Sequence, residues 1–470
     1  MHEDYEDDYN EEEIEALVSK YEDTNGKIYF DVEDFENIID FYIESGELKK
    51  ALKAIINARN LHPHSIDLEF KKAILFALTN KIEKALDLLS NIEKFSPFNS
   101  DLFLTRGAIY SKLNRYNDAI EEYKKALKND DYQNIDEIYF TIAIEYENMG
   151  NYNKAIVYLT KSLEYNKDNE ATIYELAFCY EIIGNYEQSI NYYNKFISID
   201  PFNEIAWYNI GLVYSEIELS EKAIEAFDYA IAINDKFVDS YYNKANEYFQ
   251  LDEYAKALNT YKEVLEFDDK EALAYLYIAM CYEKEQEYDL AINEYLKATQ
   301  LDQYLSDAWF GLSIVYSAKK EKDLTYKYME KTIALDGLNP DFWYAFANIQ
   351  KDFEDIEEAI QSYQKAIQID PLLVEAWLDY SLTLWEADDY YKAIDILNEG
   401  LLIESIDEVS ILYRLAAYNY TIGNDINGNV FFTRALELDC ELYNEVFEFN
   451  PDLTENIEIN NLILEYKNNK

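Results

Sequence analysis

Apolar residues recur along most of the chain with helical spacing, and the pattern itself repeats every 34 residues. With Glu204 as position 1 of a unit, units begin at residues 32, 66, 100, 136, 170, 204, 238, 272, 306, 340, 374 and 409. Within a unit, positions 4, 7, 8 and 11 share one helical face, and positions 20, 21, 24, 27 and 28 share another. The pattern therefore predicts twelve units of two helices each.

A turn is predicted between the two helices, around positions 14–17 of each unit. Glycine at position 15 supplies the left-handed backbone that commonly ends a helix. This residue is Gly46, Gly150, Gly184 or Gly423 in four units. Position 32 is proline in four units, and proline there ends the second helix because it cannot continue the helical hydrogen bonds.

Position 8 of the first helix carries a small residue in eleven of the twelve units. In the stretch EIAWYNIGLVYSE it is Gly211, although glycine within a helix costs about 1 kcal/mol relative to alanine. We expect position 8 to face position 20 of the second helix, so that only small residues let the two backbones approach. The large residues at positions 4, 11 and 24 would fill the spaces beside this contact.

The unit at residues 204–237 contains a spaced set of large and small residues, namely Trp207, Ile210, Gly211, Tyr214, Ala223, Phe227 and Ala230. With these residues the unit resembles the tetratricopeptide repeat, whose pattern is W-x2-L-G-x2-Y, then A-x3-F, then P. The resemblance implies an all-α fold, a right-handed α-solenoid superhelix of stacked antiparallel helix pairs. In this family the first helices line the concave face and the second helices mainly line the convex face.

We expect three segments along the chain. Residues 1–31 would be an acidic tail with a short capping helix, of which residues 1–10 are expected to be disordered. Residues 32–442 would form the twelve tetratricopeptide repeats, and residues 443–470 the C-terminal capping helices. The apolar face of the first capping helix is expected to be Ile14, Leu17 and Tyr21.

The expected buried stripe of the last helix is Ile457, Leu462, Ile463 and Tyr466. Val446, Phe447 and Phe449 are expected to be exposed apolar residues, suited either to capping or to dimerisation.

The formal net charge is −53, from 94 acidic and 41 basic residues. Such a charge repels phosphate backbones and anionic lipid surfaces, so we expect no nucleic-acid partner and no membrane partner. It suits either a solvated outer face or attraction to basic partners. Three cysteines without paired spacing, an acidic start and no long apolar run favour a cytoplasmic location.

No converging catalytic constellation is apparent, so we expect no enzyme activity, no metal site and no cofactor. His62 and His64 flank Pro63 without further ligands nearby, and the loop NDINGN (424–429) lacks the acidic ladder of a calcium loop. The carboxylates are numerous but spread over helix surfaces.

The concave groove is the remaining place for function, because the family directs positions 2, 5, 9, 12 and 13 of the first helix into it. Position 5 is aromatic in eight of the twelve units, with acidic residues interspersed. The predicted partner-binding residues are Phe140, Tyr174, Phe178, Tyr208, Tyr242, Asn246, Phe310, Tyr344 and Asn348. The two asparagines could bond the main chain of an extended peptide through both donor and acceptor.

A second interpretation stays open at this point, in which the position-5 aromatics partly pack against the neighbouring first helix. Positions 2 and 5 contain no lysine or arginine in any unit, so the carboxylate clamp of chaperone-binding relatives is absent.

The sequence favours a non-catalytic scaffold or adaptor that binds protein or peptide segments with basic and apolar residues in this groove. Two alternatives are a self-associating structural subunit (a homo-oligomer) and an accessory module that presents substrates to a separate enzyme.

Overall fold

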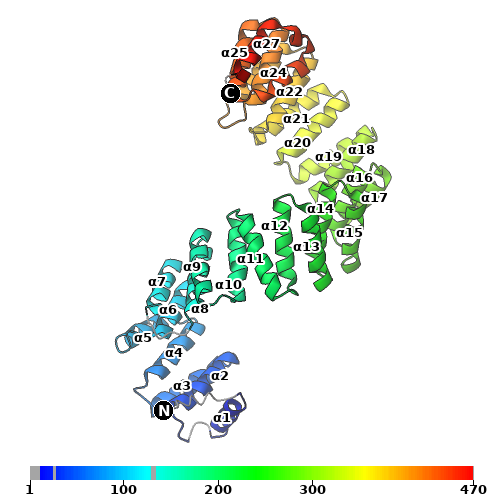
Figure 1. The fold of residues 1–470 in the computed structure, drawn as a ribbon. Helices are drawn as coiled ribbons and strands as arrows, with labels where there is room; N and C mark the ends of the chain where they lie inside the picture. Colours follow the sequence, from blue (N-terminus) through cyan, green and yellow to red (C-terminus); the bar gives the residue numbers. More distant parts are fainter. Residues whose placement is uncertain (1–10, 25–27, 129–133, 469–470) are drawn as a thin grey trace. The chain divides into compact units, whose positions relative to one another are not determined.

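The computed structural model describes residues 11–24, 28–128 and 134–468 of the chain (Figure 1). Within these ranges the secondary structure is helical, with no strand, as the all-α prediction requires. The expected disorder of residues 1–10 lies outside the described residues. The chain divides into two compact units, one ending at Asp235 and the other beginning at Lys236.

The first unit contains thirteen helices within its described residues. They are α1 (Glu11–Thr24), α2 (Val32–Glu44), α3 (Leu48–Leu61), α4 (Ile66–Leu78), α5 (Ile82–Glu93), α6 (Ser100–Lys112), α7 (Tyr116–Ala126), α8 (Ile135–Asn148), α9 (Tyr152–Tyr165), α10 (Glu170–Ile182), α11 (Tyr186–Ile199), α12 (Glu204–Glu216) and α13 (Ser220–Ile233).

The second unit continues the series with α14 to α27 and two short 3-10 helices. The helices are α14 (Val238–Gln250), α15 (Tyr254–Phe267), α16 (Ala272–Lys284), α17 (Tyr288–Leu301), α18 (Ser306–Ala318), α19 (Lys322–Leu335), α20 (Pro340–Asp352), α21 (Ile356–Ile369), α22 (Val374–Glu386), α23 (Tyr390–Gly400), α24 (Val409–Thr421), α25 (Asp425–Leu438), η1 (Glu441–Tyr443), α26 (Asn444–Phe449), η2 (Pro451–Glu455) and α27 (Ile457–Asn468).

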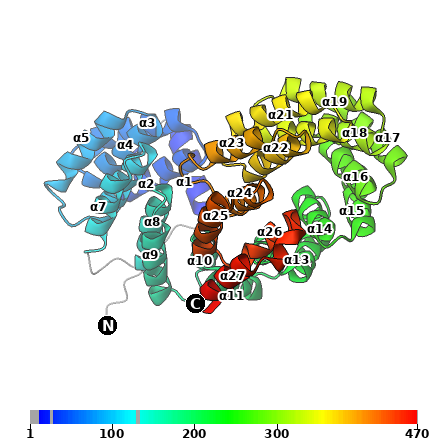
Figure 2. The same ribbon diagram turned by 90° about the horizontal axis from the view of Figure 1, so that it is seen from above.

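Helices α2 to α25 form twelve pairs, and each first helix packs against the second helix that follows it. The first helices begin at the predicted unit starts, except that α8 begins at Ile135, one residue early. Figure 2 shows the pairs as successive hairpins of similar length. The chain is therefore an α-solenoid in which each pair buries its apolar face against its neighbours.

In every pair, the residue at position 15 of the turn has a left-handed backbone conformation. The four glycines predicted there have φ values of 69° to 77°. The other eight turns place a non-glycine residue at φ of 58° to 63°, which an L-residue adopts at a cost of about 1–2 kcal/mol. These residues are Asn80, Asn114, Glu218, Asp252, Gln286, Lys320, Glu354 and Asp388. The turn geometry is thus set by the helix pair rather than by glycine.

Gly211 is a packing residue, but its partner is an aromatic ring rather than the backbone at position 20. A Cβ atom on Gly211 would lie 2.6 Å from Cε1 of Phe227, which occupies position 24 of the same repeat. Gly107 stands in the same relation to Tyr123, at 2.3 Å from Cε1. The small residue at position 8 therefore makes room for the ring at position 24.

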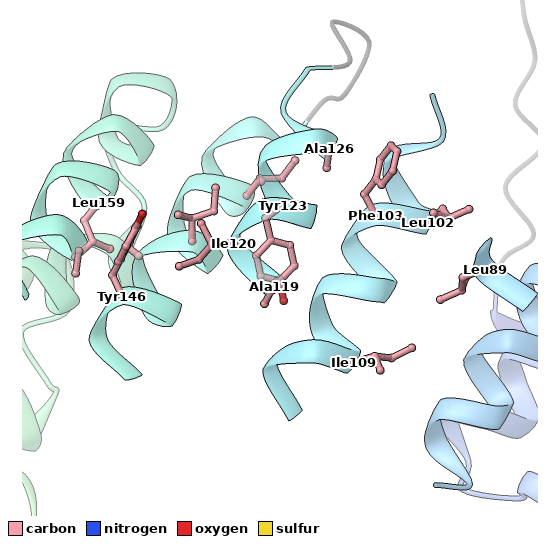
Figure 3. Packing of buried hydrophobic residues seen from close by; sticks show 14 of the residues in the cluster. Leu89, Leu102, Phe103, Ile109, Ala119, Ile120, Tyr123, Ala126, Tyr146 and Leu159 are labelled. Carbon is pink, nitrogen blue, oxygen red and sulfur yellow. The ribbon is translucent and has the colours of Figure 1, made fainter. Parts of the chain in front are cut away.

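Figure 3 shows one continuous core in the first unit, to which successive repeats contribute side chains. Its labelled residues are Leu89 on α5; Leu102, Phe103 and Ile109 on α6; Ala119, Ile120, Tyr123 and Ala126 on α7; Tyr146 on α8; and Leu159 on α9. Because no single pair buries its apolar face alone, each repeat depends on the next for its core.

The terminal helices cover the ends of the array. At the start, α1 buries Leu17, Val18 and Tyr21, and Asn57 Nδ2 donates to the Tyr21 hydroxyl over 2.8 Å. At the end, α27 buries Ile459 and Ile463, which are one turn apart on the same face.

Two expectations for the C-terminal region were wrong. Ile457 is 77% exposed, because the buried face of α27 is set by Ile459 and Ile463. Val446 is buried and Phe447 is half-buried. Phe449 packs its ring 4.9 Å from Tyr418. These residues belong to the core of the last repeats, so they do not form an exposed dimerisation surface.

Candidate functional site

The nine predicted groove residues all lie on first helices, in two sets. The first unit carries Phe140 on α8, Tyr174 and Phe178 on α10, and Tyr208 on α12. The second unit carries Tyr242 and Asn246 on α14, Phe310 on α18, and Tyr344 and Asn348 on α20. All nine are half-buried, so part of each side chain remains exposed.

The four position-5 tyrosines of the predicted site make ring contacts with position 24 of their own repeat. Tyr174 lies 5.9 Å from Tyr193 between ring centroids, in an edge-to-face arrangement. The corresponding pairs are Tyr208 with Phe227 at 5.9 Å, Tyr242 with Tyr261 at 6.1 Å and Tyr344 with Tyr363 at 6.2 Å. One edge of each ring therefore stabilises the helix pair, a contact that the sequence analysis did not foresee.

Two of these tyrosines also bridge to position 6 of the following repeat. Asn209 Nδ2 donates to the Tyr174 hydroxyl over 2.7 Å, and the Tyr344 hydroxyl donates to Asp379 Oδ2 over 2.6 Å. Burial, together with the bond to Asp379, raises the pKa of Tyr344 to about 12. The hydroxyls thus fix the spacing of adjacent first helices within each unit.

Asn246 and Asn348 are engaged inside their own repeats, which changes the role expected for them. The hydroxyl of Tyr261 donates to Oδ1 of Asn246, and that of Tyr363 donates to Oδ1 of Asn348. One of the two lone pairs of each amide oxygen is therefore occupied. Binding of a peptide main chain by the second lone pair and by the Nδ2 donors stays a prediction.

Acidic residues at position 12 accept hydrogen bonds from position-24 tyrosines in two repeats. Tyr193 donates to Glu181 Oε2 over 3.0 Å, and Tyr295 donates to Glu283 Oε2 over 2.6 Å. Burial raises the pKa of both carboxyl groups, while the tyrosine bonds oppose that shift. These carboxylates are positioned by the core, so they are fixed features of the first-helix surface.

Glu147, also at position 12, has a strongly perturbed pKa. Its Oε1 accepts from the Cys179 thiol, whose sulfur is 3.2 Å away on α10. The pKa of Glu147 is raised to about 7, mainly by burial; the Cys179 bond opposes this shift and the charge of Glu175 favours it. A carboxyl group in this state gains from a nearby cation, because a lysine or arginine side chain would favour its ionised form.

A cavity of about 390 Å³ opens between the first helices α16 and α18 of the second unit. Its walls are Leu276, Tyr277, Met280, Glu283, Lys284, Tyr295, Asp307, Phe310, Gly311 and Ile314. Among these is Phe310, a predicted site residue. Gly311 allows this arrangement, because a Cβ atom there would lie 2.2 Å from Cζ of Tyr295. The cavity has apolar walls with carboxylates at Glu283 and Asp307.

The described ranges contain no group of three or more His, Cys, Asp or Glu residues placed to hold a metal ion. No helix in the described part of the chain is both long and apolar enough to cross a membrane. The three cysteines are free and buried.

Sequence profiles described as tetratricopeptide repeat match seven segments of the chain. One profile matches residues 238–270. A second matches residues 100–132, 136–169, 171–203, 205–237, 272–304 and 340–371. Each matched segment coincides with one helix pair of the structure. A search of curated proteins gave no match.

Solved structures similar to the chain include a crystal structure of MamA, at 27% identity and a TM-score of 0.33, which covers 34% of this chain and 95% of that one. A tetratricopeptide repeat protein from Parabacteroides merdae is 17% identical, with a TM-score of 0.45, and covers 53% of this chain and 98% of that one. YrrB, described as a TPR protein with an unusual peptide-binding site, is 22% identical, with a TM-score of 0.33 and coverage of 38% and 92%.

Proposed function

The chain belongs to the tetratricopeptide repeat family, and from that premise we propose that it is a non-catalytic scaffold whose first helices bind segments of partner proteins. Proteins of this family generally act through protein interactions. The proposal adds where the segment lies and which side chains it must carry.

The observation that carries the proposal is the cavity between α16 and α18. It is lined by positions 5, 6 and 9 of two consecutive first helices, with Leu276, Met280, Phe310 and Ile314 as apolar walls. Its volume of about 390 Å³ falls within the range of roughly 300–1,000 Å³ typical of ligand pockets. We propose that it receives one apolar side chain of the bound segment.

The charges around this cavity support a segment that also carries lysine or arginine. Glu283 and Asp307 lie at its border beside one cation, Lys284, so the carboxylates outnumber the basic groups, and the whole chain has a net charge of −53. A basic residue beside the apolar anchor would therefore be attracted before and after docking. Glu147 and Glu181 support the same preference in the first unit.

We propose the cytoplasm as the place of action. The support is the free, buried state of Cys179, Cys281 and Cys440, which suits a reducing compartment.

A displayed library of random peptides tests the groove directly. Asp307→Lys should reduce the recovery of basic peptides, and Phe310→Ala should reduce the recovery of peptides with an apolar anchor. Asp323→Lys is a matched control, because Asp323 holds the same place in the first turn of α19 that Asp307 holds in α18.

Equal recovery of the same peptides by the wild type and both groove variants would contradict the proposal. Loss of recovery in the Asp323→Lys control as well would reduce the effect to net charge alone. Recovery of basic peptides should also fall with added salt, since screening shortens to about 8 Å near physiological ionic strength.

A further inference from the structure

Position 4 of the first helix holds a large apolar or aromatic residue in eleven of the twelve repeats. In four of them it is tryptophan, and its Nε1 donates to the carbonyl at position 32 of the preceding repeat. The pairs are Trp207 with Pro201 at 3.0 Å, Trp309 with Gln303 at 3.0 Å, Trp343 with Gly337 at 2.9 Å and Trp377 with Pro371 at 3.0 Å. This bond fixes the junction between consecutive repeats.

The ring at position 4 also packs on the second helix of its own repeat, at positions 23, 26 and 30. Trp309 lies 5.9 Å from Tyr328 at position 23. Trp207 stacks on Tyr229 at position 26, with centroids 4.3 Å apart. Tyr241 contacts Phe267 at position 30, at 5.4 Å. The position-4 ring therefore occupies a defined site. We call this site the aromatic seat; it is bordered by positions 23, 26 and 30 of the same repeat and by position 32 of the preceding repeat.

The second repeat is the exception, because its position 4 is Glu69, the only charged residue at that place in the twelve repeats. The Glu69 carboxylate pairs with Arg59, and Lys72 Nζ lies 3.6 Å from its other oxygen. The side chain is thus held by cations of α3 and α4.

A cavity of about 500 Å³ is bordered by Glu69 and by the positions that contact the ring in other repeats. It is lined by Pro63, His64, Ser65, Ile66, Glu69, Leu88, Asn91, Ile92 and Phe95. Leu88, Asn91 and Phe95 hold positions 23, 26 and 30, and Pro63 holds position 32. All four walls of the aromatic seat are therefore present.

Phe95 is more exposed than Phe267, the residue at the same position of a repeat that has a position-4 ring. It is 76% exposed, whereas Phe267, at the same position under Tyr241, is 42% exposed. Phe95 therefore leaves an apolar ring open at the border of the cavity.

We propose that this cavity binds a tryptophan side chain of a partner protein, which takes the seat that position 4 fills in the other repeats. Its indole N–H would donate to the Pro63 carbonyl, and its ring would lie against Asn91 and Phe95. Tryptophan fits better than other residues, because in four repeats of this chain the position-4 tryptophan makes the same hydrogen bond to position 32 of the preceding repeat.

The occupant comes from a different protein rather than from a second copy. Four of the five tryptophans of this chain fill their own seats, and the fifth, Trp385, stacks on Tyr418 with centroids 4.1 Å apart. Two copies that each carry a net charge of −53 also repel each other. This site is separate from the proposed groove between α16 and α18.

The test measures binding of a short tryptophan-containing peptide to the full chain, with a fluorine label on the indole and detection by fluorine NMR. N-acetyl-tryptophanamide and the same peptide with alanine in place of tryptophan are the comparison probes. We expect the tryptophan peptide to bind the wild type and the alanine peptide to bind at least about tenfold more weakly.

Glu69→Trp should fill the seat from within and abolish binding of the peptide. Glu83→Trp is the matched control, because it adds a tryptophan to the exposed face of α5 in the same repeat and should leave binding unchanged. Phe95→Ala provides a second variant that removes a mostly exposed wall, and it should weaken binding.

Failure of the tryptophan peptide to bind the wild type would overturn the proposal, as would unchanged binding to both Glu69→Trp and Phe95→Ala. Binding of N-acetyl-tryptophanamide without binding of the peptide would overturn the protein partner in favour of a small aromatic ligand. Because the peptide library variants lie on α18, these outcomes do not depend on the groove proposal.

Discussion

Replacing Gly211 by alanine tests how the repeat is packed, because two effects of known size oppose each other. Alanine gains about 1 kcal/mol of helix propensity over glycine. Its Cβ atom would meet the Phe227 ring at 2.6 Å from Cε1, 2.8 Å from Cδ1 and 3.1 Å from Cζ. Overpacking of this kind costs about 1–3 kcal/mol, so we expect Gly211→Ala to destabilise the protein by up to about 2 kcal/mol.

The steric part can be separated from the helix propensity in a double-mutant cycle with Phe227→Leu. Without the ring, Gly211→Ala should become neutral or stabilising by about 1 kcal/mol, since only the propensity gain remains. The coupling between the two sites should then equal the overpacking cost, about 1–3 kcal/mol. Urea unfolding of the four proteins, followed by far-ultraviolet circular dichroism, measures each term.

The reasoning would be refuted if Gly211→Ala raised the unfolding midpoint equally in both backgrounds. That result would mean that the Phe227 ring moves aside at no cost, and position 8 would then be small for some other reason. An equal loss in both backgrounds would instead place the clash with the backbone at position 20, as the sequence analysis supposed.

Three further changes probe the turns, the junctions and the charges. Glu218 has a left-handed backbone conformation, which glycine adopts without strain. Glu218→Gly should therefore raise the free energy of unfolding by about 0.5–1 kcal/mol, and a lower urea midpoint would contradict the presence of strain. Trp343→Phe removes the bond to the Gly337 carbonyl and should cost about 1 kcal/mol or more of unfolding free energy, whereas an unchanged thermal midpoint would show that the bond adds nothing. The neutral form of Glu147 is favoured in the fold, so its contribution to stability is present at low pH and is lost as the pH rises from about 4.5 through about 7. Glu147→Gln should flatten the dependence of the melting temperature on pH in that window, and an identical dependence in the variant would exclude Glu147 as its cause.

The fold could be predicted from the sequence because a fixed 34-residue period determines where each helix begins and which of its faces is apolar. Once apolar positions recur every 34 residues with helical spacing, the helix starts follow, and only α8 begins one residue from its predicted place. The residues whose burial was predicted wrongly lie beyond the last repeat. Ile457 and Val446 follow the last repeat, so no other repeat shows which of their faces is buried.

The candidate site was predicted less well, because facing a groove and facing solvent are different properties. Tyr174 and Tyr344 lie at positions predicted to face the groove, yet their rings and hydroxyls are used in packing. The period locates a side chain on a helix face, but the hydrogen bond to the next repeat depends on Asn209 and Asp379, whose residue type varies from repeat to repeat.

The sequence does contain a sign of the unfilled aromatic seat in the second repeat, because position 4 there departs from the residue type of the other eleven repeats. Glu69 breaks the apolar pattern at position 4, but a charge on a helix is ordinarily a solvated residue. Only the cavity and the uncovered ring of Phe95 show that the break leaves a space rather than a closed junction.

The tryptophans at the repeat junctions allow unfolding to be followed by fluorescence, but they are unevenly distributed between the two units. Trp309, Trp343, Trp377 and Trp385 lie in the second unit, and Trp207 alone lies in the first. Tryptophan fluorescence, excited selectively over tyrosine, will therefore report mainly on the opening of junctions after Lys236, and only Trp207 will report on the helices before Asp235. A fluorescence melt that precedes or follows the loss of helical signal would thus reveal which half of the array opens first.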